Sequence, residues 1–208
     1  MYLHELWKFA WTDLGIRFDY AEQEGLFDKM IVRYDEPHRY YHTRKHILDC
    51  IESWEQVYEA ELKHPHAVAL ALYYHDVVYD THRGDNEDRS ADLFAHHAAS
   101  LGLASLHIER IIQMILATKN HDSDDSDTRV LLDIDLSILG ADSDAFWQFE
   151  AQIRREYFWV PEALYRAERA KIMRGFLASE PLFHTTYFRD RLESQAKANL
   201  KALITSLT

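Results

Sequence analysis

Apolar residues recur at three- and four-residue spacing along almost the whole chain, which is the period of amphipathic helices. The pattern predicts ten helices, over residues 2–15, 20–33, 43–62, 66–80, 87–101, 105–119, 128–139, 143–158, 162–178 and 188–206. Only six glycines and four prolines interrupt it, and no alternating stretch is bounded by Asn-Gly or Asp-Gly turns. We therefore expect an all-α fold of about 8–10 helices.

Residues typical of helix ends flank several of these segments. Asp19 and Thr43 precede the second and third helices as N-cap residues, and Pro161 is expected at a first helical position. Gly102 and Gly140 are expected to stop the helices before them. These residues support the predicted boundaries.

Length and charge narrow the class of protein. The 208 residues fit one domain, 1–208, that is large enough to bury a core. The net charge of −12 argues against binding of long nucleic acids through phosphate neutralisation. Cys50, the one cysteine, excludes an internal disulfide and indicates a reducing compartment. With no secretory signal pattern and no apolar run of about 18 residues, we expect a cytoplasmic protein that does not span a membrane.

Residues 120–127, Asn-His-Asp-Ser-Asp-Asp-Ser-Asp, form an acidic stretch that is typical of a solvated turn. The stretch superficially resembles a calcium loop. However, Asp127 stands where such a loop needs glycine, and Asp133 stands where it needs the closing glutamate. We therefore expect a solvated loop here and no calcium site.

A histidine and an aspartate interrupt the apolar segment at 69–79. On a helix, the neighbours of His75 at three and four residues are Ala71, Leu72, Val78 and Tyr79, so His75 faces a core. Burial of Asp76 beside it is costly unless the carboxylate has a partner. A bound cation would supply that partner.

The segment Leu131–Leu139 poses the same question. Asp133 and Asp135 are two residues apart, about 200° around a helix, so they cannot point at one site. Asp135 has four apolar helical neighbours and is expected to be the buried one. Asp133 is expected at the boundary of the core, as a partner of Arg129 or an outer contact of the site.

Two further histidines lie upstream, four residues apart. If a helix starts at Thr43, His46 lies in its first turn, whereas His42 lies in the loop. His46, His75, Asp76 and Asp135 would together offer mixed nitrogen and oxygen ligands. Such a set suits a divalent transition metal or Mg²⁺ better than a structural zinc.

The order of these residues resembles the HD-domain superfamily of metal-dependent phosphohydrolases. The segments Tyr-His-Thr-x-x-His, Tyr-His-Asp-Val-Val-Tyr-Asp, Asp-Asn-Glu-x-x-Ser-Ala and Asp-Ile-Asp-Leu-Ser-Ile-Leu-Gly are similar to those of an uncharacterised bacterial subgroup. The resemblance covers about residues 34–140, and the helices of 141–208 are assigned to the same subgroup. It implies an HD-like helical domain in which His46, His75, Asp76 and Asp135 ligate one metal ion. That ion would polarise a phosphoryl oxygen and activate a water.

Each of the residues around this set has more than one interpretation. Glu87 and Asn86 either cap a helix, or orient the attacking water and contact substrate beside the ligand Asp76. His121 is a second-metal ligand, a phosphate contact or a cation at a helix C-terminus. We expect one metal ion, because no further buried pair of histidines is evident.

Phosphate binding would need cations near the ligands. Arg39 and Lys119 are the preferred pair, although each flanking cation taken singly is more often a solvated surface residue. Arg44, Lys45 and Arg83 also flank the proposed ligands.

The sequence thus predicts a hydrolase of a small phosphorylated metabolite, a nucleotide or another phosphomonoester, with one divalent ion (Mn, Mg, Fe, Co, Ni or Zn). One alternative keeps the metal but not the phosphate chemistry, as in HD-type hydratases and oxygenases. Another is a non-catalytic metal- or nucleotide-binding helical module. We expect no membrane partner and no long nucleic acid, and a homo-oligomer remains open.

Overall fold

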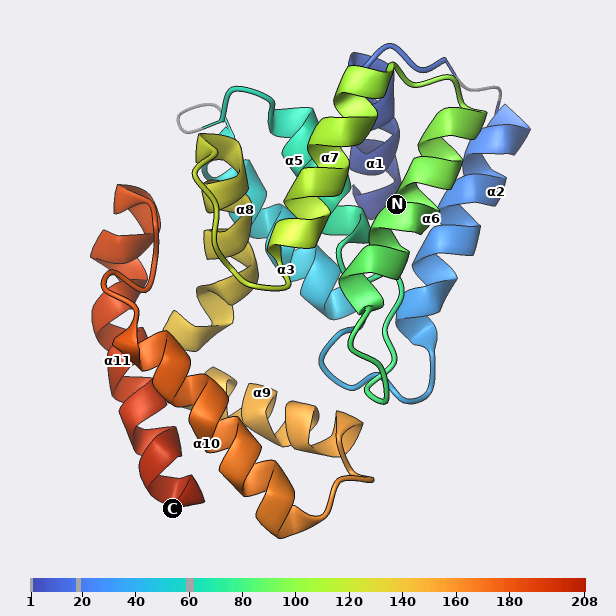
Figure 1. The fold of residues 1–208 in the computed structure, drawn as a ribbon. Helices are drawn as coiled ribbons and strands as arrows, with labels where there is room; N and C mark the ends of the chain where they lie inside the picture. The colour runs from blue at the N-terminus through green and yellow to red at the C-terminus, as the bar shows by residue number, and fades with distance from the viewer. Residues whose placement is uncertain (1, 18–19, 59–61) are drawn as a thin grey trace. The chain divides into compact units, whose positions relative to one another are not determined.

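A computed structural model describes residues 2–17, 20–58 and 62–208. Within these ranges the chain forms ten α-helices and two 3-10 helices and no strand, which confirms the all-α prediction (Figure 1). The chain divides into two compact units, residues 1–134 and 135–208. Whether the chain is a single domain stays a prediction. None of the described helices is long and apolar enough to cross a membrane.

The first unit holds most of the helices and three of the four predicted ligands, and the fourth, Asp135, is the first residue of the second unit. Its elements are α1 (Tyr2–Asp13), α2 (Tyr20–Ile31), the 3-10 helix η1 (Val32–Asp35), α3 (Arg44–Glu55), α5 (Pro65–Tyr74), α6 (Asn86–Ser100), α7 (Ser105–Ala117) and α8 (Ser126–Asp135), which ends at the division. The second unit contains the 3-10 helix η2 (Leu136–Gly140), α9 (Ser143–Glu156), α10 (Glu162–Ala178) and α11 (Thr186–Leu207).

Helix α5 is the centre of the first unit. Every residue from Ala67 to Tyr74 is buried, and the helix packs against α1, α3, α6 and α7 (Figure 1). An apolar surface on all sides is what a helix surrounded by others requires. Pro65 starts it at a position where the missing N–H costs nothing. The element that carries His75 is therefore held on all sides.

The structure tests the predicted helix ends individually. Thr43 is the N-cap of α3, where its hydroxyl accepts a hydrogen bond from the Lys45 N–H. Gly102, with φ of 76°, ends α6 in a pair of hydrogen bonds that only a left-handed residue closes easily. Asp19 lies outside the described residues.

Two predicted ends differ in detail. Pro161 precedes α10 as its N-cap residue instead of occupying its first turn. Gly140 ends the 3-10 helix η2, because α8 already stops at Asp135. A Cβ at Gly140 would lie 2.5 Å from the Leu192 Cβ and 2.9 Å from the Leu192 carbonyl oxygen, so glycine lets η2 and α11 approach closely.

Polar groups also fix the second unit. The Asn199 side chain on α11 donates to the carbonyls of Leu139 and Ala141, each at 2.9 Å. Glu150 on α9 is buried and ion-paired with Arg169 on α10. These contacts join η2, α9, α10 and α11 within one unit.

Candidate metal centre

Four side chains that are distant in sequence meet at one point of the structure. His46, His75, Asp76 and Asp135 each offer one ligand atom, and these atoms all lie within 4.8 Å of one another. The two histidines are buried and the two aspartates are half-buried. This arrangement confirms the prediction that these four residues come together as a group that could hold a metal ion.

The helices explain how the four residues converge. His46 lies in the first turn of α3, on the face that also buries Ile47, Cys50 and Ile51. His75 is the C-cap of α5, and Asp135 is the last residue of α8. The predicted helix 66–80 thus ends at Tyr74, and His75 and Asp76 occupy the turn that follows. The C-terminus of a helix favours a nearby cation because of its exposed carbonyls.

The backbone contact of His75 fixes a proton on its Nδ1. Its Nδ1 lies 2.9 Å from the Leu72 carbonyl oxygen, which can only accept, so Nδ1 donates. In a neutral ring, Nε2 then presents a lone pair. A hydrogen bond of this kind from the outer nitrogen is the usual way in which a metal-ligating histidine is oriented.

The distances around His75 fit a shared ion. Its Nε2 lies 3.2 Å from the His46 Nε2 and 3.0 Å from the Asp76 Oδ2. Two ligands about 2.1 Å from one ion, at angles of about 90–110°, lie about 3.0–3.4 Å apart. The His46 Nε2 and Asp76 Oδ2 are 3.7 Å apart. A modest contraction would bring all three ligand atoms to one ion.

The donor set also fits a cation chemically. An ionised Asp76 is only an acceptor, and the Nε2 of neutral His75 is an acceptor as well. Their contact at 3.0 Å therefore needs either a proton on His75 or a metal ion between the two atoms. A second imidazole and a second carboxylate in the same sphere favour the metal ion.

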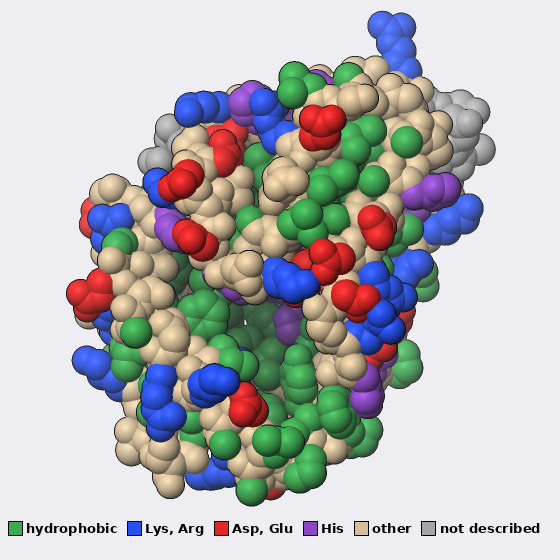
Figure 2. All heavy atoms as spheres, in the orientation of Figure 1, with side chains coloured by type: hydrophobic (Ala, Val, Ile, Leu, Met, Phe, Trp, Pro, Cys, Tyr) green, Lys and Arg blue, Asp and Glu red, His purple; other side chains and the backbone are tan. Residues whose placement is uncertain are grey.

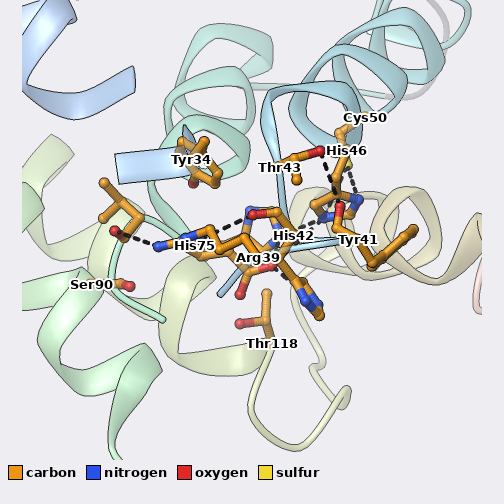
Figure 3. A network of polar contacts seen from close by, with 12 residues as sticks. Tyr34, Arg39, Tyr41, His42, Thr43, His46, Cys50, His75, Ser90 and Thr118 are labelled. Atoms are coloured by element: carbon orange, nitrogen blue, oxygen red, sulfur yellow. Dashed lines mark hydrogen bonds and ion pairs between the residues drawn. The ribbon is translucent and has the colours of Figure 1, made fainter. Parts of the chain in front are cut away.

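Two residues near this cluster were not among the predicted site residues. The His42 Nε2 lies 3.8 Å from the Asp76 Oδ2, and its ring packs 4.3 Å from the Tyr79 ring. The Cys50 Sγ lies 3.7 Å from the His46 Nε2 (Figure 3). The spacing of four residues between His46 and Cys50 could have predicted the second contact, whereas the loop position of His42 gave no signal for the first.

The backbone of the turn that carries Asp76 is held by side chains from other elements. Ser90 on α6 accepts from the Val78 N–H at 3.1 Å. Asn86 binds Asp80 twice, accepting from its N–H and donating to its carbonyl. The ring of His38 contacts the Tyr79 carbonyl at 2.9 Å.

Arg39 completes this set of contacts from a buried position. Its guanidinium donates to the Asp76 carbonyl at 2.7 Å and the Val77 carbonyl at 3.1 Å (Figure 3). It also donates to the His42 carbonyl at 3.2 Å and to the Glu36 carboxylate. Four of its five N–H groups therefore already have partners.

The cations that flank the cluster in sequence all have carboxylate partners. The pairs are Arg39–Glu36, Arg44–Asp35, Lys45–Asp49, Arg83–Asp85 and Lys119–Asp88. The hydrogen bond that Lys119 donates to the Asp88 carboxylate raises the pKa of Lys119, so this ammonium stays charged. A phosphate would have to compete with a carboxylate for each of them.

The burial predicted for Asp133 and Asp135 is reversed in the structure. Asp133 is fully buried, whereas Asp135 is half-buried. Asp133 is not one of the four clustered residues, as predicted from its spacing from Asp135 on the helix. The apolar neighbours of Asp135 in the sequence led to a prediction of more burial than the structure shows. Asp135 is the last residue of α8, where packing around the helix stops.

The prediction that residues 120–127 form a solvated turn is wrong at Asp127. Its carboxylate is buried and accepts from the N–H groups of Lys63 and His64, at 3.0 and 2.8 Å, and contacts the His64 ring. It thereby binds the start of α5 to the start of α8. The remaining acidic residues of this stretch, such as Asp122 and Asp124, are exposed as predicted.

Other predicted site residues lie on α6 and after α7. Glu87 is half-buried in the first turn of α6. His121 follows α7 with a positive φ of 52°, an uncommon conformation for a residue other than glycine. A cavity of about 520 Å³ lies along α7 and residues 122–128, where hydrophobic side chains gather over α7 (Figure 2). None of the four cluster residues lines it.

No family model, curated protein or solved structure matches this chain. The resemblance to the HD superfamily therefore depends on the motifs and on the cluster that they form.

Proposed function

We propose that this chain is a metal-dependent hydrolase of a small phosphorylated molecule, related to the HD superfamily. The observation that supports the proposal is the cluster of two imidazoles and two carboxylates at the end of α5. With three or four protein ligands, an ion of coordination number five or six keeps positions open for water and substrate. When bound, the ion would supply a Lewis acid for a phosphoryl oxygen and an activated water.

The protein's own residues have distinct roles in this proposal. His75 is held by Leu72 with its lone pair toward the cluster, and Asp76 supplies negative charge beside it. Glu87 is the proposed partner for the proton of the attacking water. Asn86 is proposed as a positioning residue, because its side chain binds the Asp80 backbone twice. Lys119 and His121 are the proposed contacts of the phosphate.

One observation favours a second candidate function. Every cation that flanks the cluster in sequence is already paired with a carboxylate. A reaction without phosphate, of the hydratase or oxygenase type, would leave these pairs intact. The proposed metal site would then act on a substrate that needs no positively charged side chain for binding.

Phosphate release tests the two candidates. The protein is loaded in turn with Mn²⁺, Mg²⁺, Co²⁺, Ni²⁺, Fe²⁺ and Zn²⁺ and assayed against mononucleotides and other phosphomonoesters. We expect release with at least one ion, its loss in His75→Ala, and its retention in His96→Ala, which alters an exposed histidine on α6. A protein that binds metal but releases no phosphate from any substrate would contradict the phosphohydrolase and favour the second candidate.

A further inference from the structure

Arg39 occupies an unusual position for a charged side chain, because none of it is exposed. Its guanidinium lies 5.0 Å from the centre of the Tyr34 ring and 5.3 Å from that of Tyr79. Tyr34 is itself buried, which raises its pKa well above the usual range, so its hydroxyl stays protonated and donates to the Tyr73 carbonyl. These aromatic rings thus hold the planar guanidinium of Arg39, the fork of N–H donors, in one orientation.

The hydrogen bonds of Arg39 join the two segments that supply the first three ligands. One is the loop that leads into α3, through the His42 carbonyl, four residues before His46. The other is the turn after α5, through the carbonyls of Asp76 and Val77. These bonds bridge 37 and 38 residues of sequence. One side chain therefore sets the spacing between the segments.

We propose that Arg39 is a positioning residue for the metal centre and does not bind the substrate. By fixing the Asp76 carbonyl against the loop before His46, it holds the ligand atoms at the separations that one ion requires. The proposal rests on the metal site of the proposed function, but not on phosphate chemistry. It also explains why four of the five N–H donors of Arg39 bind protein groups and are not free to bind a phosphate.

Lysine cannot replace this arrangement. Its ammonium is a compact charge on a flexible stem, whereas the planar fork of arginine reaches three carbonyls and a carboxylate at once. Arg39→Lys keeps the charge and loses the geometry. Removal of a side chain that holds metal ligands in place typically lowers the metal affinity by about 10–100-fold.

The second unit offers a matched control. Arg154 donates to the Glu162 carboxylate and to the carbonyls of Tyr157 and Val160, and lies 4.6 Å from the Tyr165 ring. It therefore has the same kinds of partner as Arg39, with all of them in residues 135–208. The Arg154 side chain is 30% exposed, so Arg154→Lys removes the same kinds of contact without touching a metal ligand, and the melting temperatures of the metal-free forms show how far each substitution destabilises the fold.

The experiment is a titration of the metal-free protein with Co²⁺, followed by visible absorption and calorimetry, with melting temperatures of the metal-free forms. We expect Co²⁺ to bind Arg39→Lys about 10–100-fold more weakly than wild type, with an altered Co²⁺ spectrum. Arg154→Lys should bind as wild type does. If Arg39→Lys fails to fold, Glu36→Gln replaces the charged acceptor of the Arg39 Nε–H with a neutral one and should weaken Co²⁺ binding about threefold or more.

The outcomes separate the two proposals. Wild-type affinity and spectrum in a folded Arg39→Lys, or in Glu36→Gln if it is used instead, would overturn the positioning role and leave the metal site intact. A wild-type protein that binds no Co²⁺ would overturn both the site and the inference. Weak binding by the Arg39 variant, in a protein that releases no phosphate, would support the inference and contradict the hydrolase.

Discussion

Asp127 offers a quantitative test of how the helices that carry the ligands are held. Its buried carboxylate accepts three hydrogen bonds from the segment that starts α5. Asp127→Ala would remove a charged acceptor from all three donors, each bond to a charged group being worth about 1.5–3 kcal/mol. Lys63 is exposed and the His64 ring is 40% exposed, so part of this loss is recovered by water. We expect the free energy of unfolding to fall by about 2–4 kcal/mol.

The assay is urea denaturation followed by circular dichroism, with the midpoint and slope measured for each variant. Asp124→Ala serves as the control, because Asp124 lies in the same loop with a fully exposed side chain. We expect its midpoint to match that of the wild type. If Asp127→Ala cost no more than Asp124→Ala, the buried carboxylate would not be what joins α8 to α5.

Two further predictions concern stability elsewhere in the chain. Gly140→Ala should lower the unfolding free energy by about 1–3 kcal/mol, because its Cβ would meet the Leu192 backbone; an unchanged denaturation midpoint would contradict this close approach. Burial, with nearby His96 and Arg33, lowers the pKa of His97 from 6.5 to about 4. Between these pH values the unfolded chain takes up a proton that the folded chain does not, so stability should fall as the pH drops from 6.5 toward 4. The fall should be smaller in His97→Asn, and an equal pH dependence would refute the assignment.

The four residues of the cluster could be predicted because each carries a local signal. His75 and Asp135 are polar residues among apolar neighbours at helical spacing, Asp76 adjoins His75, and His46 lies in the first turn of a helix that Thr43 was expected to cap. The helices followed from the same period. Their ends were less accurate, because the turn after Tyr74 is held by Arg39 and by side chains of α6, and periodicity contains no information on such contacts.

The roles of Arg39 and Asp127 escaped prediction because both side chains act through the backbone of other segments. Arg39 binds carbonyls, which every residue has, so no sequence pattern distinguishes its partners from other residues. Asp127 binds N–H groups 63 and 64 residues away and was therefore assigned to solvent with its exposed neighbours. Such contacts depend on how the helices pack. The prediction that Asp135 is more buried than Asp133 was wrong for the same reason.

The central claim is that His46, His75, Asp76 and Asp135 hold one divalent ion. Elemental analysis after equilibrium dialysis against each candidate ion tests it most directly, with His46→Ala as the matched variant. The account predicts one ion per wild-type chain for at least one metal and a large loss of that ion in the variant. A wild-type chain that retains no ion, or a folded variant that retains as much as the wild type, would contradict it.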